Sequence, residues 1–209
     1  MSLLDTITQQ LGGDTMSQLS RQIGADPQTT QSAVQMALPV LLGGLARNAS
    51  NPAGASALDN ALAKDHDGSM LDNLGSLLGN PQSANGGGIL GHVFGGRREP
   101  VEAGVAQASG LSAQQTGKLL MILAPIVMAA LGRMKRNQGM DAGGVGDVLQ
   151  RESSTAQRQL PGGLGGMLGG LLDRNNDGSV MDDIGRMSGG LCGLGGMLGG
   201  GGTDRTTGR

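Results

Sequence analysis

The sequence predicts an all-α fold: an irregular multihelical array built from two related helical repeats, with Gly-rich flexible segments. In its long uncharged stretches apolar residues recur at steps of three and four, which is the period of an amphipathic helix. No window alternates at every second residue as a half-buried strand would. The chain also repeats itself, as helical arrays often do.

Two segments align without gaps at an offset of 86 residues. They are GADPQTTQSAVQMALPVLLGGLAR at residues 24–47 and GLSAQQTGKLLMILAPIVMAALGR at residues 110–133. Each opens with a side chain that caps helices, Asp26 before a proline in one and Ser112 in the other. We expect two long core helices, each bent where Pro39 or Pro125 removes a backbone hydrogen bond.

Shorter helices are predicted at residues 2–11, 15–23, 56–63, 69–78, 101–108 and 144–151. Residues 86–96, 161–170 and 189–202 mix Gly with Leu and Met, and a helix there is marginal because Gly costs about 1 kcal/mol per interior position. The predicted organisation is a first repeat ending in an acidic loop and helix (1–80), a Gly-rich linker (81–100), a second repeat with the same ending (101–188), and a disordered Gly-rich tail (189–209).

Composition and charge exclude several classes of protein. The chain has 209 residues, of which 41 are Gly and none is Trp or Tyr, so large apolar side chains are scarce. Its net charge is -2, with no basic field for strong phosphate binding, so nucleic acid is not an expected partner. A single cysteine, Cys192, excludes an intramolecular disulfide. No secretory signal is visible and the longest uncharged apolar run has 13 residues, so the default expectation is a cytoplasmic protein.

The sharpest chemical motif is an acidic loop, DRNNDGSVMDDI, at residues 173–184. Its opening matches the calcium-loop pattern D-x-[DN]-x-[DN]-G, in which alternate oxygen-bearing side chains point at one cation. The predicted ligands are Asp173, Asn175, Asp177, Ser179 and Asp183. Ile184 replaces the bidentate Glu of the pattern, so we expect weak affinity. A turn followed by a helix cap, from the spacing of Ser179 and Asp182, accounts for the same residues without a metal.

A looser copy of this loop, KDHDGSMLDNL, occupies residues 64–74. Ala63 stands at the first ligand position, which leaves Asp65, Asp67 and Asp72, so a metal is less expected here. We interpret His66, which lies between two aspartates, as a solvated loop residue.

No motif indicates catalysis. Cys192 has no neighbouring base, and His92 lies in an apolar setting that favours a packed or surface histidine. The spacing of Gly86, Gly88 and Gly91 matches the dinucleotide fingerprint by letter only, because no strand precedes it. We expect no enzyme.

A helix-turn-helix interpretation fits the short helices on either side of Gly24 and of Gly110. The face that would read DNA offers Gln28, Thr29, Gln31 and Ser32. None of these is basic, and only Arg21 and Lys118 lie close by, whereas such proteins usually add several phosphate contacts. A corner in a packed helical array is the simpler interpretation.

Several motifs together resemble a known family. They are MSLLD, ALPVLLGGLARNA, GGILGHVFGG, SGLSAQQTGKLLMILAPIVMAALGR and LLDRNNDGSVMDDIG. The sequence resembles the bacterial family called domain of unknown function 937, which is similar to YidB-like proteins, over nearly the whole chain. The resemblance implies a bacterial source and a multihelical fold of longer and shorter helices, and it implies no reaction or substrate.

The functional expectation is a non-enzymatic helical protein that works through binding or self-association, with a protein partner or a second copy of itself. The acidic loop at residues 173–184 would be a weak calcium site, and no other cofactor and no small-molecule substrate is indicated. The alternatives are a helix-turn-helix-like DNA-binding regulator and a peripheral membrane protein. The Leu/Met/Gly segments that would serve the membrane lack the basic face usual in interfacial helices.

Overall fold

The structure is a computed structural model that describes residues 2–159, with side chains described to residue 156. Within this range the fold is all-α, as predicted, and no strand is present. The elements are α1 (Leu3–Gln10), α2 (Asp14–Ile23), α3 (Pro27–Ala49), α4 (Pro52–Lys64), the 3-10 helix η1 (Ser69–Asn73), α5 (Leu74–Gly79), η2 (Pro81–Ala84), α6 (Gly86–Phe94), η3 (Gly95–Arg97), α7 (Arg98–Ser109), α8 (Ala113–Gln138) and α9 (Ala142–Gln159).

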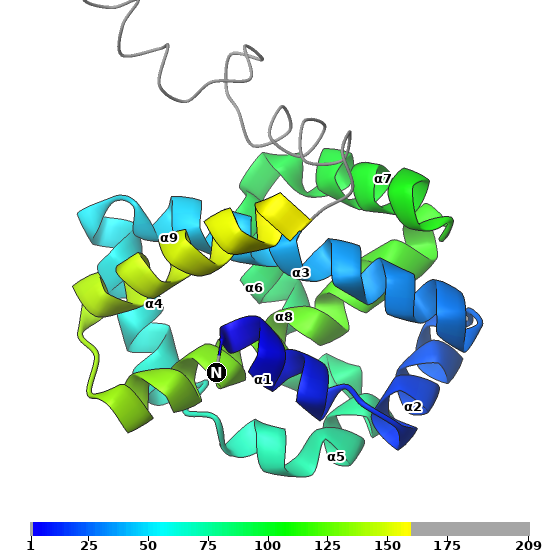
Figure 1. Cartoon of the computed structure of the whole chain (residues 1–209), viewed down its shortest axis with the longest axis horizontal. Coiled ribbons are helices and arrows are strands. Elements are labelled where there is room, and N and C mark those ends of the chain that lie inside the picture. Colours follow the sequence, from blue (N-terminus) through cyan, green and yellow to red (C-terminus); the bar gives the residue numbers. More distant parts are fainter. Residues whose placement is uncertain (1, 160–209) are drawn as a thin grey trace, which may run out of the picture.

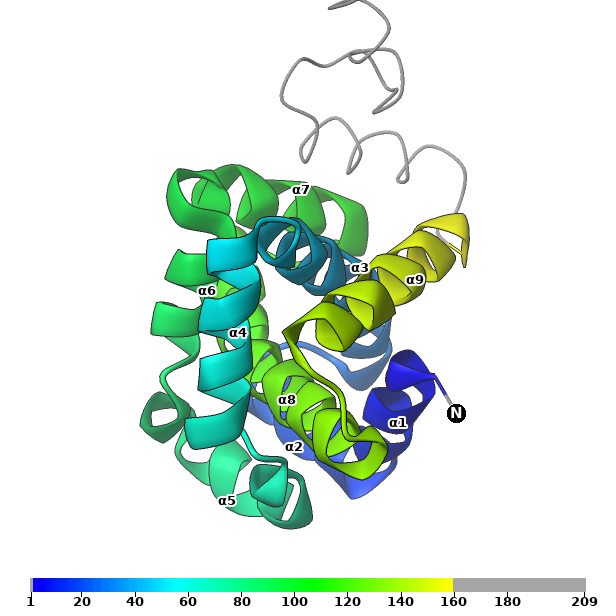
Figure 2. The ribbon, with the colours of Figure 1, turned by 90° about the vertical axis from the view of Figure 1, so that its left-hand side faces the viewer.

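Two long helices, α3 and α8, form the centre of the fold and pack on each other. Helices α7 and α9 also pack on α3, while α1 and α6 pack on α8, so the shorter helices surround the long pair (Figures 1 and 2). One hydrophobic core runs through all of these elements. The two aligned segments therefore share a single core.

The starts of α3 and α8 have the same local structure. Gly24 and Gly110 lie shortly before the two helices, with φ of 75° and 79°, a left-handed conformation that suits Gly. The Asp26 carboxylate accepts a hydrogen bond from the Thr29 amide at 2.9 Å, and the Ser112 hydroxyl accepts one from the Gln115 amide at 3.2 Å. These are the two capping residues that the sequence predicts.

Both internal prolines are buried, and each helix continues through its proline. The residues around each proline are buried on all sides of the helix, from Ala37 to Ala46 in α3 and, apart from Met121, from Leu119 to Leu131 in α8. Burial of this extent compensates for the hydrogen bond that each proline removes.

The prediction of a Gly-rich linker at residues 81–100 is wrong in one respect, since Gly86–Phe94 is the helix α6. Leu90 and Phe94 are buried in the core, and a Cβ at Gly86 would overlap the backbone carbonyl of Met121 in α8. The absence of a side chain at Gly86 therefore permits the close contact between α6 and α8. Tertiary packing outweighs the low helix propensity of Gly here.

The shorter helices differ from prediction mainly at their ends. Helix α4 starts earlier, because the Asn51 side chain caps it by accepting a hydrogen bond from the Gly54 amide at 2.7 Å. The helix predicted at residues 69–78 is split at Asn73 into η1 and α5. The second repeat is described to residue 159, and the Gly-rich stretches 161–170 and 189–202 lie outside the described residues.

Candidate binding groove

The predicted calcium ligands, Asp173, Asn175, Asp177, Ser179 and Asp183, lie outside the described residues, and so does Cys192. In the part of the chain that the structure describes, no group of three His, Cys, Asp or Glu side chains could hold a metal ion. The first acidic loop does lie within this part, and its contacts are visible.

Two carboxylates of the first acidic loop contact the basic end of α8. Asp67 accepts hydrogen bonds from the amide and hydroxyl of Ser69, at 3.0 and 2.7 Å, and pairs with Arg136 at 3.2 Å. Asp72 pairs with Arg133 at 2.5 Å, and Arg133 also donates to the carbonyl of Gly68 at 2.9 Å. Arginine side chains thus supply the positive charge next to these carboxylates.

The pKa of Asp67 is lowered from its ordinary value, first by the Ser69 hydroxyl and amide and then by the charge of Arg136. On the same turn of α8, Lys135 pairs with Asp59 of α4 at 2.6 Å. Basic residues in the last turns of a helix also lie near the negative end of its dipole. The structure adds direct contacts that fasten α4 and η1 to the end of α8.

His66 is buried, so its interpretation as a solvated loop residue is wrong. Its Nδ1 has no hydrogen-bond partner, and its backbone carbonyl lies against Gly132 of α8 so closely that a Cβ there would overlap it. Burial lowers the pKa of His66 below the ordinary value of histidine, and the charge of Asp65 opposes this only in part. His92 is exposed, as a surface histidine would be.

The helical corners that would contact DNA lie side by side. The Gln115 side chain at the start of α8 donates a hydrogen bond to the carbonyl of Gly24, at 2.6 Å. This hydrogen bond joins the turn of the first corner, where Gly24 is exposed, to the start of the second long helix. Gln28 and Gln31 are exposed on α3.

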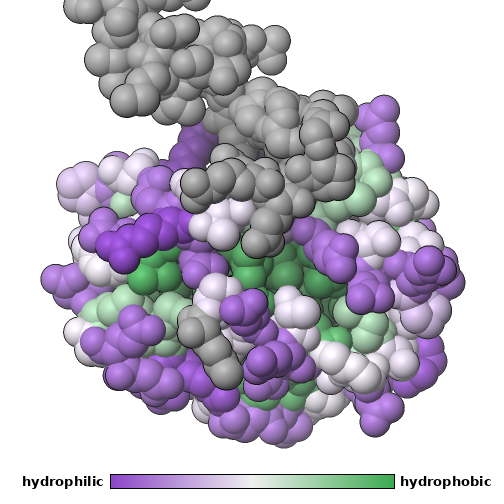
Figure 3. Space-filling view, in the orientation of Figure 1, coloured by the Kyte–Doolittle hydropathy of each residue, from purple (hydrophilic) through white to green (hydrophobic). Residues whose placement is uncertain are grey.

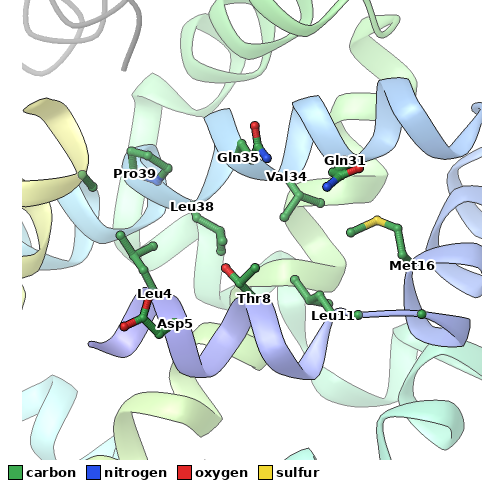
Figure 4. A pocket seen from close by; sticks show the side chains of 13 residues that line it. Leu4, Asp5, Thr8, Leu11, Met16, Gln31, Val34, Gln35, Leu38 and Pro39 are labelled. Carbon is green, nitrogen blue, oxygen red and sulfur yellow. The ribbon is translucent and has the colours of Figure 1, made fainter. Parts of the chain in front are cut away.

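A groove of about 480 Å³ lies between α1 and α3, and is closed by the start of α2 at one end and by α9 at the other. Its apolar lining is Leu4, Leu11, Met16, Val34, Leu38, Pro39 and Ala156. Val34 and Leu38 point from α3 toward α1, and Met16 points into the space from α2 (Figure 4). The surface shows a hydrophobic band here, bordered by hydrophilic residues (Figure 3).

The polar lining of the groove carries a single ionisable group, the carboxylate of Asp5. Asp5 accepts a hydrogen bond from the Ser2 amide at 3.1 Å, and the Ser2 hydroxyl accepts one from the Asp5 amide at 3.0 Å, which is a capping box. The pKa of Asp5 is lowered by the Ser2 backbone and side-chain hydrogen bonds. The remaining polar side chains, Thr8, Gln31 and Gln35, are neutral and exposed.

Sequence reasoning missed this groove. One signal was present: α1 carries Leu4 beside the core residues Leu3 and Ile7, and the core residue Leu11 follows the helix, so the apolar face is wider than contact with one neighbouring helix requires. The part of that face that stays uncovered depends on the spacing of α1 and α3. Contacts between residues far apart in the chain determine this spacing.

A second pocket, of about 330 Å³, lies at the start of α6 and includes Gly86 and Gly87 of the fingerprint-like stretch with Asn85 and Lys118. The stretch follows the 3-10 helix η2 and lies inside α6, so the strand that a dinucleotide site requires does not precede it.

Among the described residues, α8 is long and apolar enough to cross a membrane. In this fold 78% of its most apolar window is buried, as in the core helix of a globular fold, so it is weak support for a span.

Comparison with curated proteins and with solved structures returned no match. The family model described as "Bacterial protein of unknown function (DUF937)" matches residues 5–134, which is more than half of the chain. This range runs from α1 to the turn before the last in α8 and so includes the first acidic loop, all of α3, most of α8 and nearly all of the groove lining. The chain therefore belongs to the bacterial family of unknown function DUF937.

Proposed function

We propose that this protein is a non-enzymatic binding module whose groove between α1 and α3 takes an uncharged, Leu- and Met-rich helical segment of a protein. The observation that carries the proposal is a groove of about 480 Å³, within the range of binding pockets, whose lining combines apolar side chains with mostly neutral polar ones. Self-association is one form that such binding takes, when the segment comes from the same chain or from a second copy.

The chemistry of the lining favours binding over catalysis. Its one carboxylate, Asp5, is held ionised by the hydrogen bonds of the capping box, so it is poorly suited to take up a proton near neutral pH. No base lies beside the hydroxyl of Thr8 among the lining residues. Apart from Asp5, the polar lining of Thr8, Gln31 and Gln35 is neutral, so it suits a largely uncharged segment, because most charged side chains would lose hydration without gaining a partner.

DNA binding is the weaker proposal. It would use the face around Gln28 and Gln31, which lacks basic side chains, on a chain of net charge -2. A membrane role likewise depends on segments without a basic face. A separate proposal, independent of the groove, is that the acidic loop at residues 173–184 is a weak calcium site.

The test uses an exposed position in the groove. Thr8 of α1 is exposed and points across the groove toward Leu38 (Figure 4). Thr8→Arg would fill the groove with a long charged side chain without removing a core residue. Gln9→Arg is the matched control, because Gln9 is exposed on the same helix and does not line the groove.

The measurement is the fluorescence anisotropy of a labelled helical peptide of Leu, Ala and Gln, with leucines at steps of three and four residues, titrated with the full chain. We expect Thr8→Arg to bind the peptide about tenfold more weakly than Gln9→Arg, which corresponds to roughly 1.4 kcal/mol. Equal affinities in the two variants would place peptide binding elsewhere and overturn the proposal.

A further inference from the structure

The end of the groove next to α9 is acidic. Asp5, the ionisable group of the lining, follows Leu4, which lies opposite Pro39 at this end (Figure 4). Glu152 of α9 lies close by, because its Oε2 atom accepts a hydrogen bond from the Leu4 amide at 3.4 Å. Glu152 also precedes the lining residue Ala156 by four positions, so the two share one face of α9. Two carboxylates therefore lie at this end of the groove.

Neither of these carboxylates pairs with a cation in the described part of the chain. Asp5 is exposed and accepts its hydrogen bond from the Ser2 amide, and Glu152 is half-buried. The hydrogen bonds from Ser2 lower the pKa of Asp5, so its negative charge persists at neutral pH. Within residues 2–156 the ion pairs use other carboxylates, those of Asp59, Asp67, Asp72 and Glu102. The charges of Asp5 and Glu152 are therefore available to a cation on a bound segment.

The rest of the groove offers no such charge. The described lining contains no Lys, Arg or His, and its other polar side chains are Thr8, Gln31 and Gln35. A cation buried along this part would lose hydration without gaining an ionic partner. A cation at the α9 end gains two partners of opposite charge and stays in contact with water. The groove therefore favours a basic residue at one end only.

Helix dipoles indicate which end of the bound segment is the basic one. Lys or Arg in the last turn of a helix is favoured by the partial negative charge at the carboxyl end of that helix. The amino end of α1, which has a partial positive charge, lies at the same end of the groove as Asp5. The carboxyl end of a bound helix is therefore favoured beside the start of α1, and a basic residue in its last turn reaches the carboxylates there.

We propose that the segment which occupies the groove ends in a Lys or Arg, in its last helical turn, and that this residue pairs with Asp5 and Glu152. The inference rests on the proposed function: an uncharged, Leu- and Met-rich stretch fills the apolar part, and the basic residue follows it. The bound helix then runs antiparallel to α1. Charges at the rim of an interface mainly determine orientation and specificity, so the gain in affinity is modest.

The experiment compares three forms of the labelled peptide of Leu, Ala and Gln, acetylated and amidated at its ends. One form is neutral, one has Lys in place of Gln in the last turn, and one has Lys in place of Gln in the first turn. Their anisotropy is titrated with full-length wild type, Asp5→Asn with Glu152→Gln, and Asp14→Asn. Asp14 is the matched control, because it is exposed in the first turn of α2 and does not line the groove.

We expect the wild type to bind the last-turn Lys peptide roughly two- to fivefold more tightly than the neutral peptide, which is the range of an exposed ion pair. The preference should shrink as salt is raised. The Asp5/Glu152 variant should lose it, and Asp14→Asn should keep it. Each chain is compared with itself on two peptides, so a general loss of stability in a variant does not imitate this result.

The failures are distinguishable with Thr8→Arg and its control Gln9→Arg. If Thr8→Arg weakens binding of the neutral peptide but the wild type shows no preference for Lys, the groove still binds and the pairing is overturned. A preference that survives in the Asp5/Glu152 variant, or that favours Lys in the first turn, also overturns the pairing. If the neutral peptide binds Thr8→Arg and Gln9→Arg equally, or binds no chain, the proposed function itself is overturned.

Discussion

At the scale of single residues, the contact between His66 and the end of α8 shows how a loop becomes part of the core. His66 lies between two aspartates in sequence, yet its ring is buried and the Gly132 backbone approaches its carbonyl. Of its two acidic neighbours, Asp65 is exposed and Asp67 contacts Arg136 and the Ser69 hydroxyl. Acidic neighbours in the sequence are therefore a poor indicator that this histidine is exposed to solvent.

Because burial lowers the pKa of His66, stability should depend on pH in a defined direction. The unfolded chain binds a proton near pH 6.5, the ordinary pKa of histidine, and the folded chain binds it only at lower pH. The free energy of unfolding should therefore fall as the pH drops through about 6.5. Urea unfolding at about pH 7.5 and 5.5 measures the loss, which we expect to be smaller in His66→Gln than in the wild type.

The control for this prediction is His92→Gln, because His92 is exposed on α6. Its loss of stability on acidification should match that of the wild type. Within residues 2–159, the other groups with shifted pKa values are the carboxylates Asp5, Asp26 and Asp67. Their pKa values are lowered from 3.8, so these groups titrate well below this pH window. Identical losses in His66→Gln and the wild type would contradict a buried, neutral His66.

At the scale of elements, α6 is the helix whose existence depends most on its neighbour. Its sequence, GGGILGHVF, has four Gly in nine residues, and isolated it would be a poor helix. Packing against α8 decides the outcome, since Leu90 and Phe94 reach the core where Gly86 lets the backbones approach. The long helices α3 and α8 show the opposite case, because the spacing of their apolar residues and their capping side chains both favour a helix.

Two alanine substitutions in α6 should have opposite signs. A Cβ at Gly86 would overlap the Met121 carbonyl, so Gly86→Ala should destabilise the fold by roughly 1–3 kcal/mol. Gly91 has open space around its Cβ position, so Gly91→Ala should stabilise by about 0.5–1 kcal/mol through helix propensity. Urea unfolding of both variants checks the prediction, and two effects of the same sign would contradict the packing of α6 on α8.

At the scale of the whole molecule, the first acidic loop suggests a contrast with the second. In the first loop the carboxylates of Asp67 and Asp72 meet Arg136 and Arg133 of α8. The second loop keeps the fuller set of oxygen-bearing residues in its sequence, from Asp173 to Asp183. We expect only the second loop to bind calcium.

Calcium should raise the melting temperature of the full chain, because a ligand that binds the folded state stabilises it by mass action. Magnesium should do less, since it demands tighter octahedral geometry. Asp177→Ala should abolish the calcium effect, whereas Ser179→Ala should cost about 1 kcal/mol of cap stability with or without calcium. Thermal unfolding at increasing calcium measures this, with a dissociation constant on the order of 0.1–1 mM expected. No shift at about 5 mM, roughly five times the weak end of that range, would leave the loop as a turn and a cap.

By itself the sequence determined the helical class, the two long core helices and their caps at Asp26 and Ser112. These follow from local chemistry, because residue spacing and capping side chains act within a few turns of one chain segment. Only the tertiary structure decided that α6 is a helix, that His66 is buried and that α1 and α3 leave a groove between them. Each of these depends on contacts between residues far apart in the chain, such as Gly86 with Met121 and Gly132 with His66, whose distances no local pattern encodes.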